Sequence, residues 1–166
     1  AMGLACDHEH AEHHLGAAEV DRALAAVEAR CAVDGERMTA PRRRVLELLL
    51  TAGEPVKAYD LIARYGLDGQ AAKPPTVYRA LDFLERRGLA HRIASISAYV
   101  ACTADALGED KGHAAAFLIC DCCGAAEEVA VQGGDAFARA AAGAGYAIER
   151  ITIEGHGRGP ACRVAA

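Results

Sequence analysis

The sequence predicts an α+β protein in two parts, and three observations predict it. Apolar residues recur with helical spacing up to about residue 87, and strand-type patterns become frequent after it. A stretch rich in Ala, Gly and acidic residues, typical of a hinge, interrupts the strand patterns. A chain of 166 residues with 52% hydrophobic residues can bury cores for two small domains. We therefore expect one domain over residues 16–102, a hinge over 103–112 and a second domain over 113–166.

Four helical segments are expected before residue 88. In each, apolar residues recur every three or four positions, which places them on one face of a helix. Thr39 suits the N-cap of the second helix, and Pro41 has the fixed φ angle that a first helical turn tolerates. The expected helices span residues 16–33, 41–51, 57–65 and 75–87.

A β-hairpin is expected directly after the last of these helices. Two short strand-forming segments, residues 89–94 and 98–102, are joined by Ser95-Ile96-Ser97. Three short helices followed by a hairpin are the element order of a winged helix-turn-helix, whose third helix enters the major groove of DNA and whose hairpin forms the wing. Small α/β enzymes can show the same order, so the order alone leaves both classes open.

Charge is distributed unevenly along the chain. The formal net charge is −5, yet residues 35–92 carry 11 Lys and Arg against 7 Asp and Glu, while the segments on both sides are acidic. This basic stretch coincides with the expected winged helix, as in a protein in which one module meets phosphate. Chance variation of surface charge would produce the same pattern.

The cellular location is expected to be the cytoplasm. No run of 18 apolar residues could form a transmembrane helix, and no basic start runs into an apolar stretch as in a secretory signal. Seven cysteines in a cytoplasmic chain of this size are more typical of metal ligands or unpaired thiols than of disulfides.

The C-terminal part is expected to be a small α/β unit. Strand patterns cover residues 115–119 and 127–131, a helical pattern covers 135–142, and alternating apolar residues predict a strand over 146–154. A unit this small requires a partner surface or a bound metal for stability.

Cys120 and Cys123 form the clearest metal-binding motif. They are separated by two residues at the end of an expected strand, so both thiolates can face one cation. A structural zinc ion usually takes two further ligands, and Cys162 is the only cysteine downstream. A redox pair is the alternative, but it requires a helix at the motif, whereas Gly124-Ala125-Ala126 leads towards another expected strand.

A second set of possible ligands is scattered through the chain. Each member alone is a weak signal, because a lone His is usually a surface residue and a lone Cys acts as a small hydrophobic residue. The N-terminal histidines could bind metal loosely, although a solvated tail is the simpler interpretation. The scattered set comprises His91, Cys102, His113, Glu127 and Glu128; the N-terminal set comprises His8, His10, His13 and His14.

Five short motifs run through the chain in order. They are Arg37-x-Thr39-x-x-Arg42, Lys73-Pro-Pro-Thr-Val-Tyr-Arg-Ala-Leu-Asp-Phe-Leu84, Gly88-Leu-x-His91, Ser97-Ala-Tyr-Val-x-Cys102 and Phe117-x-Ile-Cys120-x-x-Cys123-Gly. Together they resemble the ferric uptake regulator superfamily, most closely its zinc uptake regulator branch, over most of residues 16–162. The combination of the Thr-Val-Tyr-Arg-x-Leu helix with the later CxxC pair is highly specific.

The resemblance implies a homodimer with a zinc-sensing site at the hinge between its domains. The first domain would be the winged helix and the second a dimerisation domain. By matching position, the sensing ligands would be His91, Cys102, His113 and Glu128, the last preferred over Glu127 by its spacing from Cys123. Two imidazoles, one thiolate and one carboxylate suit tetrahedral Zn²⁺ and leave no position for a substrate. Such a site is typical of a sensor, so we do not expect an enzyme.

The resemblance also implies a structural zinc site in the dimerisation domain, held by Cys120, Cys123 and Cys162. The family usually supplies a second CxxC pair. Cys162 matches the second cysteine of that pair, and the position of the first is occupied by Gly159. His156, Cys122 or a water molecule could complete the site, and His156 is slightly favoured.

The function implied is a zinc-responsive transcriptional repressor that binds an inverted-repeat operator. An iron or peroxide sensor of the same superfamily is the alternative, although the Cys102 thiolate makes the site softer than iron sensors use; a zinc or thiol enzyme is a remote one. Arg79 is expected to read bases, because arginine can bond guanine bidentately, and Tyr78 to contact a phosphate or a thymine methyl group. Other candidate DNA-binding residues, most of them expected to position the DNA backbone, are Thr76, Tyr59, Lys73, Arg42, Arg43, Arg44, Lys57 and Arg86.

Overall fold

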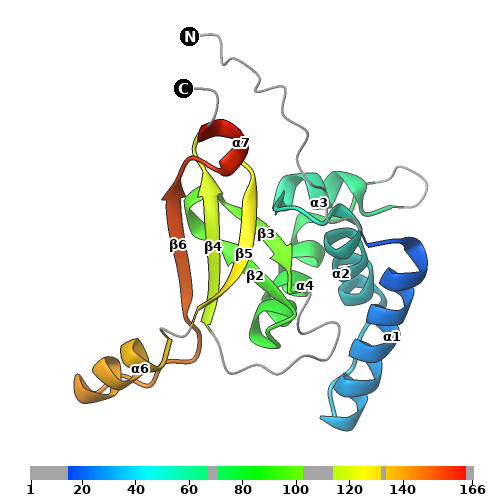
Figure 1. The fold of residues 1–166 in the computed structure, drawn as a ribbon. Coiled ribbons are helices and arrows are strands. Elements are labelled where there is room, and N and C mark those ends of the chain that lie inside the picture. The colour runs from blue at the N-terminus through cyan, green and yellow to red at the C-terminus, as the bar shows by residue number, and fades with distance from the viewer. Residues whose placement is uncertain (1–14, 67–70, 103–113, 132–133, 164–166) are drawn as a thin grey trace. The chain divides into compact units, whose positions relative to one another are not determined.

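The computed structural model describes residues 15–66, 71–102, 114–131 and 134–163, which divide into an N-terminal unit up to residue 102 and a C-terminal unit from residue 114 (Figure 1). The predicted hinge over 103–112, His113 and the N-terminal histidines lie outside the described residues. Within the described residues, no helix is both long and apolar enough to cross a membrane.

The N-terminal unit contains the four predicted helices. Thr39 occupies the N-cap position of the second helix, and Pro41 lies in its first turn, as predicted. The same helix ends at Gly53, which adopts a left-handed conformation that glycine accommodates without strain. The helices are α1 (Ala17–Val33), α2 (Ala40–Ala52), α3 (Ala58–Arg64) and α4 (Pro74–Arg86).

The apolar faces of these helices meet in one core. Each of the long helices contributes side chains spaced three or four residues apart, so the periodicity in the sequence corresponds to burial. Burying one such aliphatic side chain contributes roughly 1.5–3 kcal/mol, relative to leaving it exposed. Core residues include Val20, Leu24 and Val27 of α1, Val45, Leu46 and Leu49 of α2, and Val77, Leu81, Phe83 and Leu84 of α4.

A small antiparallel sheet completes the N-terminal unit. The predicted hairpin is present as β2 (Ala90–Ile93) and β3 (Ala98–Ala101), joined by a single 3₁₀ turn, and Ala90 pairs with Ala101. A strand absent from the sequence-based expectation, β1 (Val56–Lys57), pairs with β3 on its other edge, so the strand order is β1-β3-β2. This arrangement of three helices and a hairpin confirms the winged helix-turn-helix.

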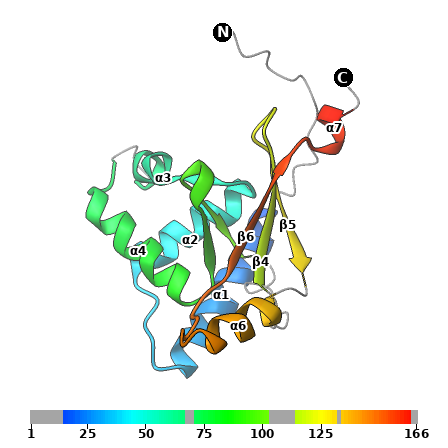
Figure 2. The same cartoon turned by 90° about the vertical axis from the view of Figure 1, so that its left-hand side faces the viewer.

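The C-terminal unit is a three-stranded sheet with two helices. Strand β4 (Ala114–Cys120) lies in the centre, antiparallel to β5 (Ala126–Val131) and parallel to β6 (Thr152–Gly157), as Figures 1 and 2 show. The predicted helix between β5 and β6 is α6 (Gly134–Gly143). After β6 follows a short helix that the sequence did not predict, α7 (Pro160–Arg163).

The predicted strand over residues 146–154 is wrong in its position. The strand in the structure begins at Thr152 and continues to Gly157. Its bounds follow from the parallel ladder with β4, which pairs Ala115 with Thr152 and Cys120 with Gly157. Tyr146 and Ile148 precede this ladder and are exposed. Alternating apolar residues therefore marked the region of the strand but not its register.

Candidate metal centres and nucleic-acid surface

Three cysteines gather at one end of the C-terminal sheet. Cys120 ends β4, Cys123 lies in the turn that follows, and Cys162 lies on α7. Their sulfur atoms lie within 4.8 Å of one another, and only 5% of Cys120 and 3% of Cys162 is exposed. The parallel pairing of β4 with β6 explains the meeting, because Gly157 lies opposite Cys120 and α7 begins three residues later.

Hydrogen bonding lowers the pKa of the Cys120 thiol. The backbone N–H group of Gly159 donates to Cys120 Sγ at 3.3 Å. Together with the backbone N–H groups of Cys123 and Cys122, it lowers the pKa of the Cys120 thiol to about 6. Burial, followed by hydrogen bonding to the neighbouring thiols, raises the pKa of the Cys162 thiol. The lowered pKa favours the thiolate form of Cys120, which is the form that binds a metal ion, whereas the raised pKa of Cys162 means that its proton must leave when a cation binds.

The cluster fits a zinc ion in both chemistry and size. Thiolates are soft ligands, and tetrahedral Zn–S bonds of about 2.3 Å place two sulfur atoms about 3.8 Å apart. Separations of up to 4.8 Å reach that value with small side-chain movements. None of the described cysteines forms a disulfide, so the thiols of Cys120, Cys123 and Cys162 remain able to bind a cation.

His156 is not brought to the three thiols. Its ring nitrogen atoms lie 3.3 Å from Asp121 Oδ1 and 3.4 Å from Glu154 Oε2, and these carboxylates raise the pKa of the imidazole. His156 pairs with Ile119 in the ladder, whereas Cys120 pairs with Gly157. Because side chains alternate between the two faces of a sheet, His156 and Cys120 point to opposite faces.

The wing brings together two of the four expected sensing ligands. His91 lies on β2, and Cys102 directly follows β3, where its backbone N–H group donates to the carbonyl of Leu89 at 3.0 Å. A ring nitrogen of His91 and Cys102 Sγ lie within 4.8 Å of each other. Glu128 lies on β5 of the C-terminal unit, opposite Phe117, and is half-buried. His113 lies outside the described residues.

Helix α4 carries four of the expected DNA-contacting side chains, among them Arg79, the one expected to read bases. Arg79 is exposed, Tyr78 is 47% exposed, and Thr76 is half-buried, whereas Val77 between them faces the core. A basic and an aromatic side chain thus project from the third helix of the winged helix. Four further candidates are exposed: Lys57, Tyr59, Lys73 and Arg86.

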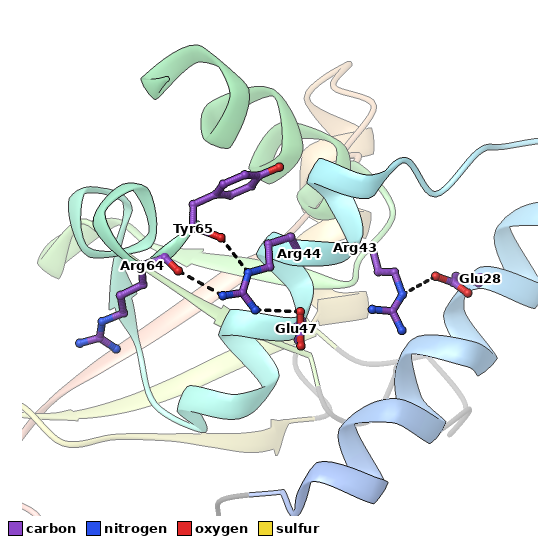
Figure 3. A network of polar contacts seen from close by, with 6 residues as sticks. All are labelled: Glu28, Arg43, Arg44, Glu47, Arg64 and Tyr65. Carbon is purple, nitrogen blue, oxygen red and sulfur yellow. Dashed lines mark hydrogen bonds and ion pairs between the residues drawn. The ribbon is translucent and has the colours of Figure 1, made fainter. Parts of the chain in front are cut away.

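Three expected DNA contacts, Arg42, Arg43 and Arg44, have partners inside the N-terminal unit. Arg44 of α2 donates from Nε to the Tyr65 carbonyl at 2.8 Å, from Nη2 to the Arg64 carbonyl at 3.2 Å, and from Nη1 to Glu47 Oε2 at 2.9 Å (Figure 3). It thereby satisfies carbonyl groups at the end of α3. Arg42 donates to the Arg37 carbonyl at 2.6 Å, and its guanidinium lies 3.6 Å from the centre of the Phe83 ring.

Arg43, next to them, joins two helices. Its Nε donates to Glu28 Oε1 of α1 at 2.8 Å (Figure 3). Both side chains are about two-fifths exposed, so this ion pair contributes little to stability.

Comparison with known proteins identifies the family. Residues 33–156 match the sequence profile of the Ferric uptake regulator family, three quarters of the chain. The chain belongs to the ferric uptake regulator family. The resemblance inferred from the five motifs is thereby confirmed.

Within this family, zinc regulators are among the similar proteins. The chain is 40% identical over 140 residues to the Zinc uptake regulation protein of Escherichia coli (strain K12), covering 84% of this chain and 80% of that protein. A solved zinc uptake regulator complexed with zinc and DNA matches with a TM-score of 0.76 and 38% identity, over 88% of this chain and 96% of the other. The holo form of XcZur matches with a TM-score of 0.70 and 39% identity, over 86% of this chain and 97% of the XcZur chain.

Proposed function

We propose that the protein is a zinc-responsive, DNA-binding transcriptional repressor, with zinc as its corepressor, that controls zinc homeostasis. The observation that carries this conclusion is the similarity of this chain to a zinc uptake regulator solved with zinc and DNA. The two are 38% identical, and the match covers 96% of that protein's chain. The winged helix and the cysteine and histidine groups supply the parts that such a function requires. The protein is a regulator and not an enzyme, and it acts in the cytoplasm, where a repressor meets DNA.

The sensing site would consist of His91, Cys102, His113 and Glu128. The first two already lie together at the base of the wing, where the hairpin register holds their ligand atoms within 4.8 Å. A tetrahedral zinc ion needs two further ligands, and His113 and Glu128 would supply them from the second domain. Zinc bound by all four would therefore join the DNA-binding domain to the dimerisation domain.

The proposed switch acts on the separation of two winged helices in a homodimer. Leu118 and Ile153 expose apolar surface on the C-terminal sheet, as expected of a surface that pairs with a second copy. Zinc would favour the arrangement in which both α4 helices reach successive major grooves, roughly 34 Å apart. A near-complete switch requires a difference of about 5.5 kcal/mol in zinc binding between the two arrangements, summed over both protomers.

DNA recognition would centre on α4. Arg79 is proposed to bond base edges, with Tyr78 and Thr76 beside it on the same helix. The exposed side chains of Lys57, Tyr59, Lys73 and Arg86 would contact phosphates. Arg44 is bonded to the end of α3, and Arg42 is bonded to the Arg37 carbonyl and lies over the Phe83 ring of α4, which favours a role for both in holding α2 against its neighbours.

The test is a titration of an inverted-repeat operator with protein of defined metal content. Zinc-loaded protein is expected to bind, and chelation of the sensing zinc is expected to release the DNA. Cys102→Ser should lose the zinc response but remain dimeric, because Cys102 lies in the N-terminal unit. Binding that responds to Fe²⁺ or to peroxide, and not to Zn²⁺, would replace this function with that of an iron or peroxide sensor.

A further inference from the structure

The cysteine cluster supplies three of the four ligands that a structural zinc ion takes. Position 159 lies directly beside it, because a Cβ atom built on Gly159 would stand 3.7 Å from Cys120 Cβ and 3.8 Å from Cys120 Sγ. A cysteine at this position would point its thiol at the cluster. Gly159 itself contributes only its N–H group, which donates to Cys120 Sγ at 3.3 Å. The backbone at this position is in place, but the side-chain ligand is missing.

A fourth thiol is present in the turn that carries Cys123. Cys122 occupies the middle of the turn, which is closed by the Gly124 N–H group donating to the Cys120 carbonyl at 2.8 Å. The Cys122 side chain is exposed, and its thiol lies within hydrogen-bonding reach of Cys162, as do those of Cys120 and Cys123. Cys122 therefore lies in the same turn as Cys123, one residue from it, and near Cys162.

We propose that Cys122 is the fourth zinc ligand and takes the place of the side chain that Gly159 lacks. Cys122 Sγ is outside the group of three sulfur atoms that lie within 4.8 Å of one another, so the exposed side chain has to turn towards them when the ion binds. The other protein candidate, His156, projects from the opposite face of the sheet and is held by Asp121 and Glu154. The proposal rests on the zinc-binding part of the proposed function.

This arrangement has a consequence for the stability of the site. Cys120 and Cys162 are buried, whereas Cys122 is exposed, so the fourth ligand lies on the solvent side. An exposed side chain with a choice of rotamers costs conformational entropy when it binds, and competing thiols or chelators reach it first. The site should exchange zinc faster than one whose fourth ligand comes from position 159.

The experiment uses the full chain in a background with Cys6→Ser, Cys31→Ala and Cys102→Ser, so that only the cysteine cluster contributes thiolate bands. Co²⁺ is the spectroscopic probe, because its sulfur-to-metal absorption grows with the number of bound thiolates. Cys122→Ser is expected to remove one quarter of that absorption and to weaken zinc binding by roughly 10- to 100-fold in competition with a chelator. The matched control is Gly159→Cys with Cys122→Ser, which should regain both the absorption and the affinity, since Gly159 has no left-handed φ angle that forbids a side chain.

Two results would overturn the proposal. The first is an unchanged cobalt spectrum and zinc affinity in Cys122→Ser, which would assign the fourth position to water. The second is loss of binding that Gly159→Cys fails to restore, because Cys122 would then support the turn and not the metal. Neither readout depends on DNA, so failure here is distinct from failure of the repressor function, which the operator titration tests.

Discussion

Two arginines that the sequence predicts to contact DNA, Arg44 and Arg79, have different surroundings in the structure. Arg44 donates three hydrogen bonds inside the N-terminal unit, whereas Arg79 is exposed on the third helix of the winged helix. A guanidinium group committed to backbone carbonyls has few donors left for DNA, whereas an exposed one can bond a base bidentately. The same residue type therefore has two expected effects on mutation.

Replacing Arg79 by Ala should weaken binding to the operator by about 1–3 kcal/mol for each base that the guanidinium reads. The expected cause is the loss of the bidentate bond to a base edge, so binding to unrelated DNA should change less. Fluorescence anisotropy with operator and scrambled duplexes measures both, and zinc content serves as the control for folding. Equal losses of affinity for the two duplexes would contradict a base-reading role.

Replacing Arg44 by Ala should lower the free energy of unfolding by about 1–3 kcal/mol, because it leaves the Arg64 and Tyr65 carbonyls without their side-chain donor. Urea unfolding followed by circular dichroism checks this. Arg43→Ala is the matched control, since its exposed ion pair with Glu28 should contribute at most about 1 kcal/mol. A larger loss of stability in Arg43→Ala than in Arg44→Ala would show that the Arg44 hydrogen bonds drawn in Figure 3 are not what joins α2 to α3.

His156 should make stability depend on pH. Asp121 and Glu154 raise its pKa above the ordinary value of 6.5. The protonated ring therefore stabilises the folded state fully below pH 6.5, and this contribution disappears as the pH rises through the raised pKa. Zinc-saturated wild-type protein and His156→Gln should differ in urea midpoint below pH 6.5 and converge at alkaline pH, above the raised pKa. A difference that persists on the alkaline side would assign His156 a role that is independent of its charge.

At the scale of the element, sequence patterns predicted the helices well and the strands less well. Helices α1, α2 and α4 are long enough for their apolar spacing to repeat several times, and α4 is bracketed by Pro74-Pro75 and Gly88. Strand β1 has two residues and no pattern of its own, since it exists because β3 offers it a partner. The start of β6 depends in the same way on its register with β4, which local sequence does not carry.

The metal groups show the same division between local and long-range information. The CxxC pair of Cys120 and Cys123 was visible because both ligands lie in one turn. Whether His156 can reach the thiols depends on which face of β6 its side chain occupies. The register of β6 with β4 decides this, and local sequence does not show that register. The proximity of His91 and Cys102 came from family resemblance, and the hairpin ladder supplies its physical reason.

At the scale of the whole molecule, the proposed function requires zinc binding and DNA binding to be linked. Any factor by which zinc tightens operator binding must also be the factor by which the operator tightens zinc binding. Couplings of this kind are typically about 1–3 kcal/mol, or roughly 5- to 150-fold. The zinc affinity of the sensing site should therefore rise by that factor when operator DNA saturates the protein, as measured by competition with a chelating dye. An unchanged zinc affinity, with DNA bound, would exclude sensing-site zinc as corepressor.

The two-residue strand β1 connects the wing to the rest of the DNA-binding unit by backbone hydrogen bonds. It begins immediately before α3 and pairs with β3, so the wing that carries His91 and Cys102 is bonded to the backbone that leads into the helix-turn-helix. Zinc bound by these two side chains would therefore act on a hairpin that is hydrogen-bonded to the segment leading into α3. Under the proposed function, the effect of zinc would then reach α3 and α4 through backbone hydrogen bonds that are already present, without a new contact inside the unit.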